Sequence, residues 1–417
     1  MRLSLLLSLT LSACCAAAVT LAAQQAPGQA QFVGSAACQK CHADQFAGWR
    51  TTRMANVVRD PVQHPEAVLG DFTHPDPVRS FDLSQVAFVY GSRWKQRYFA
   101  RMTDPQTGLP DYYALPAQWD VANRKWLPYH VPPNADWWVP HYGESNQQRP
   151  TGPLCDGCHS VNYNITTHQV TEWNVGCEKC HGPGSRHIAH PTKANIVNPD
   201  ALDSVRANDT CIQCHSQGRP LANPIADPAG DAPPQYYDWP VGYLPGERLA
   251  NHWKLEELRY GVTNFYQFAD LSAHKNRMQG NDFAQSNMYH REIRCFDCHD
   301  VHSNQNPSNL IARGNQLCLT CHTAKNPAGL KGTVSEHTHH APGSAGSQCT
   351  ACHMPKIAET LKNTYVSSHT FRFITPTLTQ QFGIPNPCTT CHTDKSNTWA
   401  LDQLRGWSNT SPWRVAN

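Results

Sequence analysis

The sequence predicts a mainly α-helical and irregular fold with little regular secondary structure, whose interior is filled by something other than aliphatic side chains. A small β-rich aromatic insert is expected beside it. Three observations predict this class. Hydrophobic residues make up only 40 % of the 417 residues and charged residues only 16 %, both low for a globular chain. Histidine (23) and cysteine (18) are unusually frequent, and aromatic residues gather in one long interval between cysteines.

Sixteen of the cysteines form eight Cys-X-X-Cys pairs, and a histidine directly follows every pair. The cysteines are Cys38, Cys41, Cys155, Cys158, Cys177, Cys180, Cys211, Cys214, Cys295, Cys298, Cys318, Cys321, Cys349, Cys352, Cys388 and Cys391, and the histidines are His42, His159, His181, His215, His299, His322, His353 and His392. This triplet is the attachment signature of c-type haem, in which two thioethers hold the porphyrin and the histidine is the proximal iron ligand. Zinc ribbons and disulfide frameworks do not require that histidine. The sequence therefore predicts eight covalently bound c-type haems in a multihaem cytochrome c fold with a haem-filled core.

The uneven spacing of the motifs divides the chain into segments. We expect a signal peptide (1–23), a first haem segment (24–60), the aromatic β-rich insert (61–150), haems two to four (151–218), Pro-rich loops with a helix (219–290) and haems five to eight (291–417). Because close motifs bring large apolar haems into contact, the two motif clusters should share one continuous haem-lined core.

Local patterns predict a few elements within these segments. Val86 to Phe99 is rich in aromatic and β-branched residues around Gly91-Ser92, which predicts a hairpin. The aromatic residues after it are expected to pack on one another, or alternatively to form a docking face. A helix is expected over His252 to Ala273 from imperfect apolar spacing, and a short helix capped by Ser396 should run to Leu404.

The N-terminus predicts export. Arg2 precedes an uncharged run from Leu3 to Ala23, as in a signal peptide. Cleavage near Ala23, lipidation of Cys14 or retention as a membrane anchor are the three possible fates. The protein is therefore expected in the periplasm, on the outer surface or outside the cell, with membrane contact only through such a lipid or anchor. The net charge of +2 gives no reason to expect a nucleic-acid partner.

Fifteen histidines remain after the eight proximal ones, enough to close the sixth position of every iron. An iron with two histidine ligands exchanges electrons without binding a substrate. The surplus of histidines therefore predicts that the protein mainly transfers electrons. The distal candidates with local support are His187, His302, His339 or His340, and His369; weaker candidates are His274, His64, His74, His141 and His252. His168 and His290 are expected at the surface. Met54 is an alternative ligand near the first motif, although packing on the porphyrin is the simpler role.

Six stretches resemble the bacterial multihaem c-type cytochromes that occur alone or fused to tetratricopeptide repeats. This group is related to the tetrahaem cytochrome of nitrifiers and, more distantly, to hydroxylamine oxidoreductase and octahaem reductases. The stretches are FVGSAACQKCHADQFAGW, TEWNVGCEKCHGPGSRH, CFDCHDVHS, GSAGSQCTACHMP, SSHTFRF and IPNPCTTCHTDKSNTWA. The resemblance implies that His187, His302 and His369 are distal ligands. It also shows a departure, because Arg53 stands where relatives usually carry a histidine.

Three functions follow from these features. The first is an octahaem electron carrier that works between unidentified donor and acceptor proteins, as in extracellular electron transfer. The second is an oxidoreductase acting on a small nitrogen or sulfur oxyanion at one open haem near Arg53. The third is a subunit of a self-associating, haem-conducting polymer. All eight motifs end in histidine, whereas catalytic relatives commonly have one divergent haem, and this favours the carrier.

Overall fold

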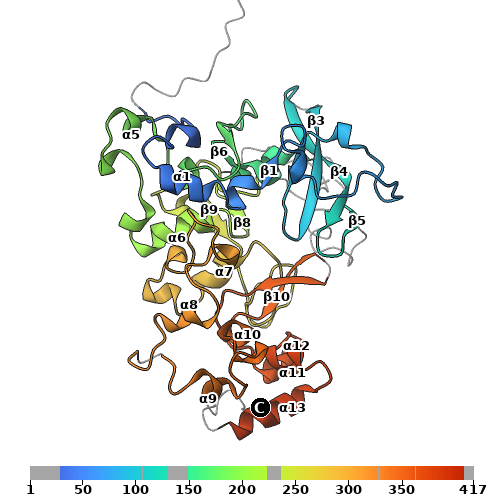
Figure 1. The fold of residues 1–417 in the computed structure, drawn as a ribbon, viewed down its shortest axis with the longest axis vertical. Coiled ribbons are helices and arrows are strands. Elements are labelled where there is room, and N and C mark those ends of the chain that lie inside the picture. Colours follow the sequence, from blue (N-terminus) through green and yellow to red (C-terminus); the bar gives the residue numbers. More distant parts are fainter. Residues whose placement is uncertain are drawn as a thin grey trace, which may run out of the picture.

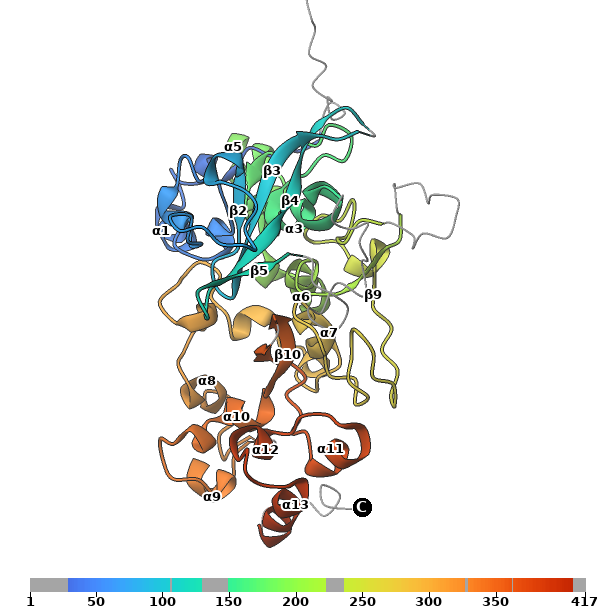
Figure 2. The same ribbon diagram turned by 90° about the vertical axis from the view of Figure 1, so that its right-hand side faces the viewer.

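The computed structural model describes residues 29–105, 107–129, 149–222, 236–326, 329–361 and 363–407. The segment predicted as a signal peptide lies outside these residues, as do His141 and Cys14. The molecule is elongated, with the first motif and the main sheet at one end and the last helices, α10 to α13, at the other (Figures 1 and 2). Motif segments thus follow one another along the long axis.

The aromatic insert forms a five-stranded antiparallel sheet in the order β1-β2-β3-β4-β5. Its strands are β1 (Val58–Arg59), β2 (Phe88–Tyr90), β3 (Lys95–Thr103), β4 (Pro110–Asp120) and β5 (Lys125–Pro128). The predicted hairpin is confirmed, with Phe88 opposite Phe99. Gly91 turns the chain at a φ of +88°, and a Cβ there would lie 2.7 Å from the Lys95 carbonyl oxygen, so glycine is required.

Aromatic side chains fill the space beneath this sheet. Tyr98, Trp119 and Trp126 are buried, and Phe81 completes the cluster. The Trp126 ring centroid lies 5.1 Å from that of Tyr98 and 5.2 Å from that of Trp119, in tilted and edge-to-face arrangements. Such contacts add about 0.5–1.5 kcal/mol per pair beyond the burial of the rings. The described aromatic residues therefore pack on one another, as one of the two interpretations of the insert predicted.

Helices are short throughout the described residues, and many end within or just after a haem-attachment motif. They are α1 (Ala43–Trp49), α3 (Gly157–His159), α4 (Glu178–His181), α5 (Ser185–Ala189), α6 (Ser204–Ile212), α7 (Gln279–Ala284), α8 (Asn315–Leu319), α9 (Val334–Thr338), α10 (Cys349–His353), α11 (Pro376–Phe382), α12 (Pro387–Cys391) and α13 (Asn397–Gly406). The predicted C-terminal helix is confirmed as α13, because the Ser396 hydroxyl accepts a hydrogen bond from the Trp399 N–H at 3.1 Å.

Three two-stranded ribbons complete the regular structure outside the main sheet. They pair β6 (Ser160–Val161) with β7 (Glu172–Trp173), β8 (Gly218–Pro220) with β9 (Trp253–Leu255), and β10 (Lys356–Leu361) with β11 (Thr364–Ser367). The expectation of loops and short helices outside the insert was therefore incomplete.

The helix predicted over His252 to Ala273 is wrong. The segment instead contains β9 and then irregular chain around Gln267, whose side chain is fully buried. Its amide donates to the carbonyls of Arg259 and Val262 at 2.6 and 2.7 Å, so this side chain satisfies backbone groups that a helix would have paired internally. Among the described residues, no helix has the length and apolar character needed to cross a bilayer.

Candidate haem-binding sites

Each haem-attachment motif folds into a single helical turn. In six of them the histidine N–H donates to the carbonyl of the first cysteine at 2.8–3.1 Å. The seventh motif forms α10, and the second runs from a π-helical turn (Gly152–Asp156) into α3. Residues three apart in such a turn are neighbours on one face, so the two thiols of a motif point the same way. This is the local geometry that two thioether bonds to one porphyrin need.

The cysteines of the motifs are not used in either alternative way. All sixteen are free of disulfide bonds. Across the described ranges, the single cluster of three or more metal-ligating side chains contains two aspartates and a histidine and includes no cysteine. Neither a disulfide framework nor a thiolate zinc site is therefore built from these residues.

Four of the motif histidines face a second histidine ring. An iron bonded to two imidazoles at about 2 Å would hold their ring centroids about 6 Å apart. The observed pairs are His42 with His187 at 6.3 Å, His181 with His302 at 6.2 Å, His353 with His337 at 6.3 Å, and His392 with His340 at 6.1 Å. Their planes diverge by 13–32°. The spacing fits a metal ion held between each pair.

Backbone carbonyls hold the second ring nitrogen of many of these histidines. The Nδ1 atoms lie 2.6–3.0 Å from a carbonyl oxygen in His181, His187, His274, His299, His340 and His369. This contact orients the ring and leaves Nε2 available, as in most metal-ligating histidines. The predicted candidates His187, His274, His340 and His369 all have this arrangement.

The C-terminal histidine run separates into different roles. His340 faces a motif histidine, whereas the adjacent His339 stacks on Trp407 at 4.3 Å. His339 turns away because its backbone takes the left-handed conformation at the end of α9, with a φ of +56°. His337, which sequence reasoning missed, faces His353 from α9. The available signal was that His337 belongs to the same histidine run as His339 and His340, sixteen residues before His353.

His302 is positioned by tight packing between its loop and α1. A Cβ added to Gly48 would lie 1.9 Å from the His302 carbonyl oxygen, so only glycine allows this approach. The loop begins right after the fifth motif, yet its histidine faces His181 of the third. The contact therefore joins two motifs that are far apart in the sequence.

His369 and His274 are placed less directly. The His369 backbone N–H donates to the buried Asp282 carboxylate at 2.8 Å. Burial lowers the pKa of His369 to about 4, and the nearby imidazoles of His299 and His215 lower it further. His274 packs its ring 4.4 Å from that of Phe268. Both side chains are half-buried, and in the part of the chain that the structure describes neither has a ring contact to a motif histidine.

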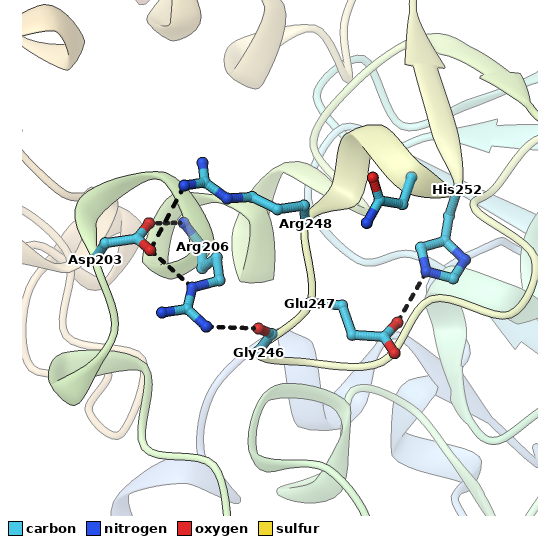
Figure 3. Close-up of a pocket in the computed structure, with 7 residues that line it drawn as sticks. Asp203, Arg206, Gly246, Glu247, Arg248 and His252 are labelled. Atoms are coloured by element: carbon cyan, nitrogen blue, oxygen red, sulfur yellow. Dashed lines mark hydrogen bonds and ion pairs between the residues drawn. The ribbon is translucent and has the colours of Figure 1, made fainter.

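Three weaker candidates for distal ligands pair with carboxylates instead. His252 Nε2 lies 2.8 Å from the Glu247 carboxylate in a surface pocket (Figure 3). His74 pairs with Asp71 at 2.8 Å, and His64 lies 3.2 Å from Glu66. These contacts indicate ordinary polar roles for the three histidines.

Two residues near the first motif lie away from the facing rings. Arg53 is exposed and lines a cavity of about 380 Å³ together with Arg93 and Arg313. The Met54 carbonyl accepts a hydrogen bond from the Val175 N–H at 3.0 Å, and its side chain is half-buried. His290 is exposed as expected, but His168 is buried against Asp111 and is not a surface residue.

A buried carboxylate ties the first motif to the third. Glu178, between the two cysteines of the third motif, is 2 % exposed. It accepts hydrogen bonds from the backbone N–H groups of Val33, Gly34 and Gly184 at 2.7–3.0 Å. Charge-assisted bonds of this kind are about twice as strong as neutral ones. The segment before Cys38 is thereby fixed against α4.

The pKa shifts of the thiols indicate which motifs are neighbours. The thiol of one motif shifts the pKa of a thiol in another for the first and third motifs, the second and fourth, the fourth and fifth, and the sixth and seventh; the pairs are Cys38 with Cys177, Cys158 with Cys214, Cys211 with Cys295, and Cys318 with Cys349.

Three further proximities connect the remaining neighbours. Burial is the main cause that raises the pKa of Cys180 to about 12, and the thiol of Cys211 adds to it. Burial likewise raises the pKa of Cys352 to about 11, and the thiol of Cys388 adds to it. Cys321 likewise contributes to the raised pKa of Cys298, after burial and Asp297. The motifs consequently form one row in the order 1-3-4-5-6-7-8, with the second motif attached beside the fourth.

The second motif is surrounded by basic groups. Burial lowers the pKa of His159 to about 4, and Arg277, Lys179 and Arg97 lower it further, as does His215. The ring packed against His159 is that of Tyr90, at 5.9 Å. The Tyr90 hydroxyl donates to the buried Asp156 carboxylate at 2.9 Å. The second motif therefore lies near three basic side chains and the buried carboxylate of Asp156.

Known proteins share one pair of the motifs and the fold of the chain. A family model described as a doubled CXXCH motif matches residues 290–327, which include the fifth and sixth motifs. The structure is similar to the outer cell wall cytochrome OcwA, with 20 % identity, a TM-score of 0.70, and coverage of 91 % of this chain and 87 % of that chain. The likeness shows that the chain has a multihaem cytochrome fold.

Two further solved structures match with lower scores. The undecahaem cytochrome from the S-layer of Carboxydothermus ferrireducens has 18 % identity and a TM-score of 0.49, with 92 % of this chain and 62 % of that chain covered. The Wolinella succinogenes octahaem sulfite reductase MccA, form II, has 14 % identity and a TM-score of 0.43, with coverage of 84 % and 59 %. No curated protein matches the sequence.

Proposed function

We propose that this multihaem c-type cytochrome carries eight haems and moves electrons along them between redox partner proteins. The sixteen motif cysteines would form the thioether bonds, and the eight motif histidines would be the proximal ligands. Haem iron supplies one-electron chemistry when bound. The role of this chain is to hold the groups close together, fix their ligands and exclude water from them.

The facing imidazoles carry this proposal. A second imidazole at the sixth position leaves no site for substrate, so such an iron changes valence with little rearrangement. We assign His187, His302, His337 and His340 as distal ligands on the four pairs at 6.1–6.3 Å. His369 and His274 are proposed for two of the remaining irons, because each is half-buried and has Nδ1 held by a backbone carbonyl, which leaves Nε2 available.

The row of motifs supports conduction over the length of the molecule. The pKa shifts of the thiols connect neighbouring motifs from the first motif to the eighth. Haems attached at these motifs would be near enough to one another for electrons to pass between them. Electrons could then enter near one end of the long axis and leave near the other.

The site of action is proposed to be outside the cytoplasm. Covalent haem attachment follows export in bacteria, the N-terminus resembles a signal peptide, and a structural neighbour is named as an outer cell wall cytochrome. The donor and acceptor are expected to be other redox proteins or extracellular acceptors.

Low-temperature electron paramagnetic resonance of the oxidised holoprotein tests the proposal, with spins counted against total haem. Haem content is measured independently from the mass of the intact chain. We expect eight haems and mainly low-spin ferric signals. Fewer than eight haems, or a predominantly high-spin spectrum, would contradict the octahaem carrier.

A second function is supported by the basic groups around His159. Arg97, Arg277 and Lys179 would attract a small oxyanion to the second haem, provided that its iron has an open position. For the oxidoreductase alternative we therefore propose the second motif instead of the surroundings of Arg53. Arg97→Gln should weaken nitrite binding to the holoprotein at least tenfold, whereas Arg53→Gln should leave it unchanged. Absence of any nitrite-induced spectral change in the wild type would exclude this function for nitrite.

A further inference from the structure

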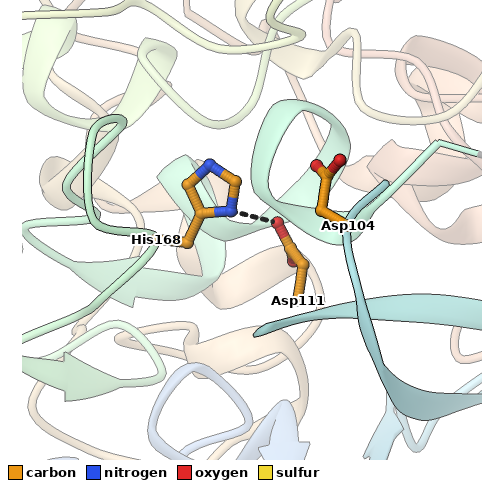
Figure 4. Close-up of side chains that lie close together, drawn as sticks. All are labelled: Asp104, Asp111 and His168. Carbon is orange, nitrogen blue, oxygen red and sulfur yellow. Dashed lines mark ion pairs between the residues drawn. The ribbon is translucent and has the colours of Figure 1, made fainter. Parts of the chain in front are cut away.

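Three metal-ligating side chains meet away from every haem-attachment motif (Figure 4). Asp104 follows β3, Asp111 lies near the start of β4, and His168 belongs to the turn between β6 and β7. One ligand atom from each lies within 4.8 Å of the other two. The aspartates are 7 % and 2 % exposed, and the His168 side chain is 8 % exposed. Two strand ends and a turn from different segments thus enclose a compact donor set.

The closest pair of these atoms is not joined by a hydrogen bond. Asp111 Oδ2 lies 2.9 Å from His168 Nδ1, yet neither buried atom makes a hydrogen bond, because the ring nitrogen is not aligned with the carboxylate. The other Asp111 oxygen accepts from the Tyr112 N–H at 2.7 Å. Two ligands of one tetrahedral zinc ion, with bonds of about 2.1 Å, would lie about 3.4 Å apart. The two atoms are therefore within about 0.5 Å of the separation that a shared zinc ion requires.

A tyrosine hydroxyl supplies an independent observation. Tyr163 is 9 % exposed, and its buried hydroxyl has no hydrogen-bond partner. A Cβ added to Gly152 would meet this oxygen at 2.0 Å and Asp111 Oδ2 at 3.3 Å, so both oxygens border the same point. An unpartnered buried hydroxyl costs about 1–3 kcal/mol. A cation, or water bound to it, would give this oxygen a partner.

Charge points in the same direction. Two carboxylates so close together in the interior repel each other, and a divalent cation bound between them would offset that repulsion. The donors are two carboxylates and one imidazole, without a thiol, which suits Zn²⁺ better than Ca²⁺ or a soft metal.

We infer that Asp104, Asp111 and His168 bind one divalent cation, with Zn²⁺ as the best fit and Tyr163 beside it. The cation would join the β3–β4 hairpin to the turn that follows the second motif. It would be separate from haem iron and redox-inert. Its role would be to fix the main sheet against the chain that carries His159.

The test uses the haem-loaded protein, first treated with chelator and then dialysed with ZnCl₂. We expect one retained zinc per chain by elemental analysis, and loss of at least nine-tenths of it in His168→Gln and Asp104→Asn. His74→Gln is the matched control, because His74 forms an exposed pair with Asp71 at the same kind of distance. Equal zinc in all four proteins, or none in the wild type, would overturn the inference.

A second measurement needs no variant. Zinc K-edge absorption of the wild-type protein should show one imidazole and otherwise oxygen ligands. Chelation should lower Tm by about 2–4 °C, and added zinc should restore it. A sulfur shell would place the zinc on cysteines that lack haem and would refute the site, even where the substituted proteins fail to fold.

Discussion

The adjacent histidines 339 and 340 offer a sharp test of ligation, because they differ in what they face. The His340 ring lies 6.1 Å from that of His392, with Nδ1 held by the Thr338 carbonyl at 2.6 Å. The His339 ring stacks on Trp407 at 4.3 Å. Replacing each in turn by alanine removes the same atoms from neighbouring positions. The sequence alone ranks them equally.

We expect His340→Ala to convert one haem in eight to the high-spin ferric form, about one-eighth of the iron. His339→Ala should leave every haem low-spin and cost about 0.5–1.5 kcal/mol of stability through the lost stacking on Trp407. Low-temperature electron paramagnetic resonance with spin counts measures the first effect, and thermal unfolding measures the second. Added imidazole should return the His340→Ala spectrum to low-spin.

The reasoning would be refuted by a high-spin haem in the His339 variant, or by an unchanged spectrum in the His340 variant. Failure of imidazole to restore the low-spin signal would show that the substitution disturbed the haem in some other way. Because the residues are neighbours in one turn, a general loosening of this region would affect both variants alike. The comparison separates ligation from packing.

Further expectations concern packing and charge. Gly157→Ala should destabilise the protein by about 1–3 kcal/mol in thermal unfolding, because the new Cβ would lie 1.8 Å from the Trp239 ring; Gly406→Ala, with nothing within 4 Å, is the control. Glu178→Ala should cost about 2–4 kcal/mol in urea unfolding, since one buried and two part-buried N–H groups lose their acceptor, and Glu178→Gln should cost less. Burial raises the pKa of the Glu256 carboxyl, so this group binds its proton more tightly in the folded protein than in the unfolded chain. The free energy of unfolding therefore falls as the pH rises from the pKa of the unfolded chain through the pKa of the folded protein. Glu256→Gln should therefore raise Tm at pH 7 and leave it unchanged at pH 3; the same gain at both pH values would contradict the burial argument.

Local signals predicted local structure well. The hairpin around Gly91 and the helix after Ser396 each depend on a few consecutive residues, and both formed as expected. The low aliphatic content also predicted little regular secondary structure. By contrast, the helix expected over His252 to Ala273 failed because a buried amide side chain within the segment, that of Gln267, satisfied backbone carbonyls there.

The facing histidine rings show where sequence reasoning stops. His187 and His302 were identified as candidates from their positions after motifs, but the motif each one faces depends on tertiary packing. In the run before the seventh motif, the left-handed turn at His339 decides which rings point inward, and composition does not reveal that turn. The metal-ligating cluster was likewise invisible, because its aspartates and histidine come from separate segments.

The facing rings also have a consequence for how the chain folds during its synthesis. Near the C-terminus the partners are close in sequence, residues 337 and 353, and can meet by closing a short loop. Near the N-terminus, residue 42 must meet residue 187, and residue 181 must meet residue 302. The first part of the chain to emerge is therefore among the last to complete its contacts. Its exposed thiols must stay reduced and unpaired meanwhile, which makes this end dependent on helpers that protect it.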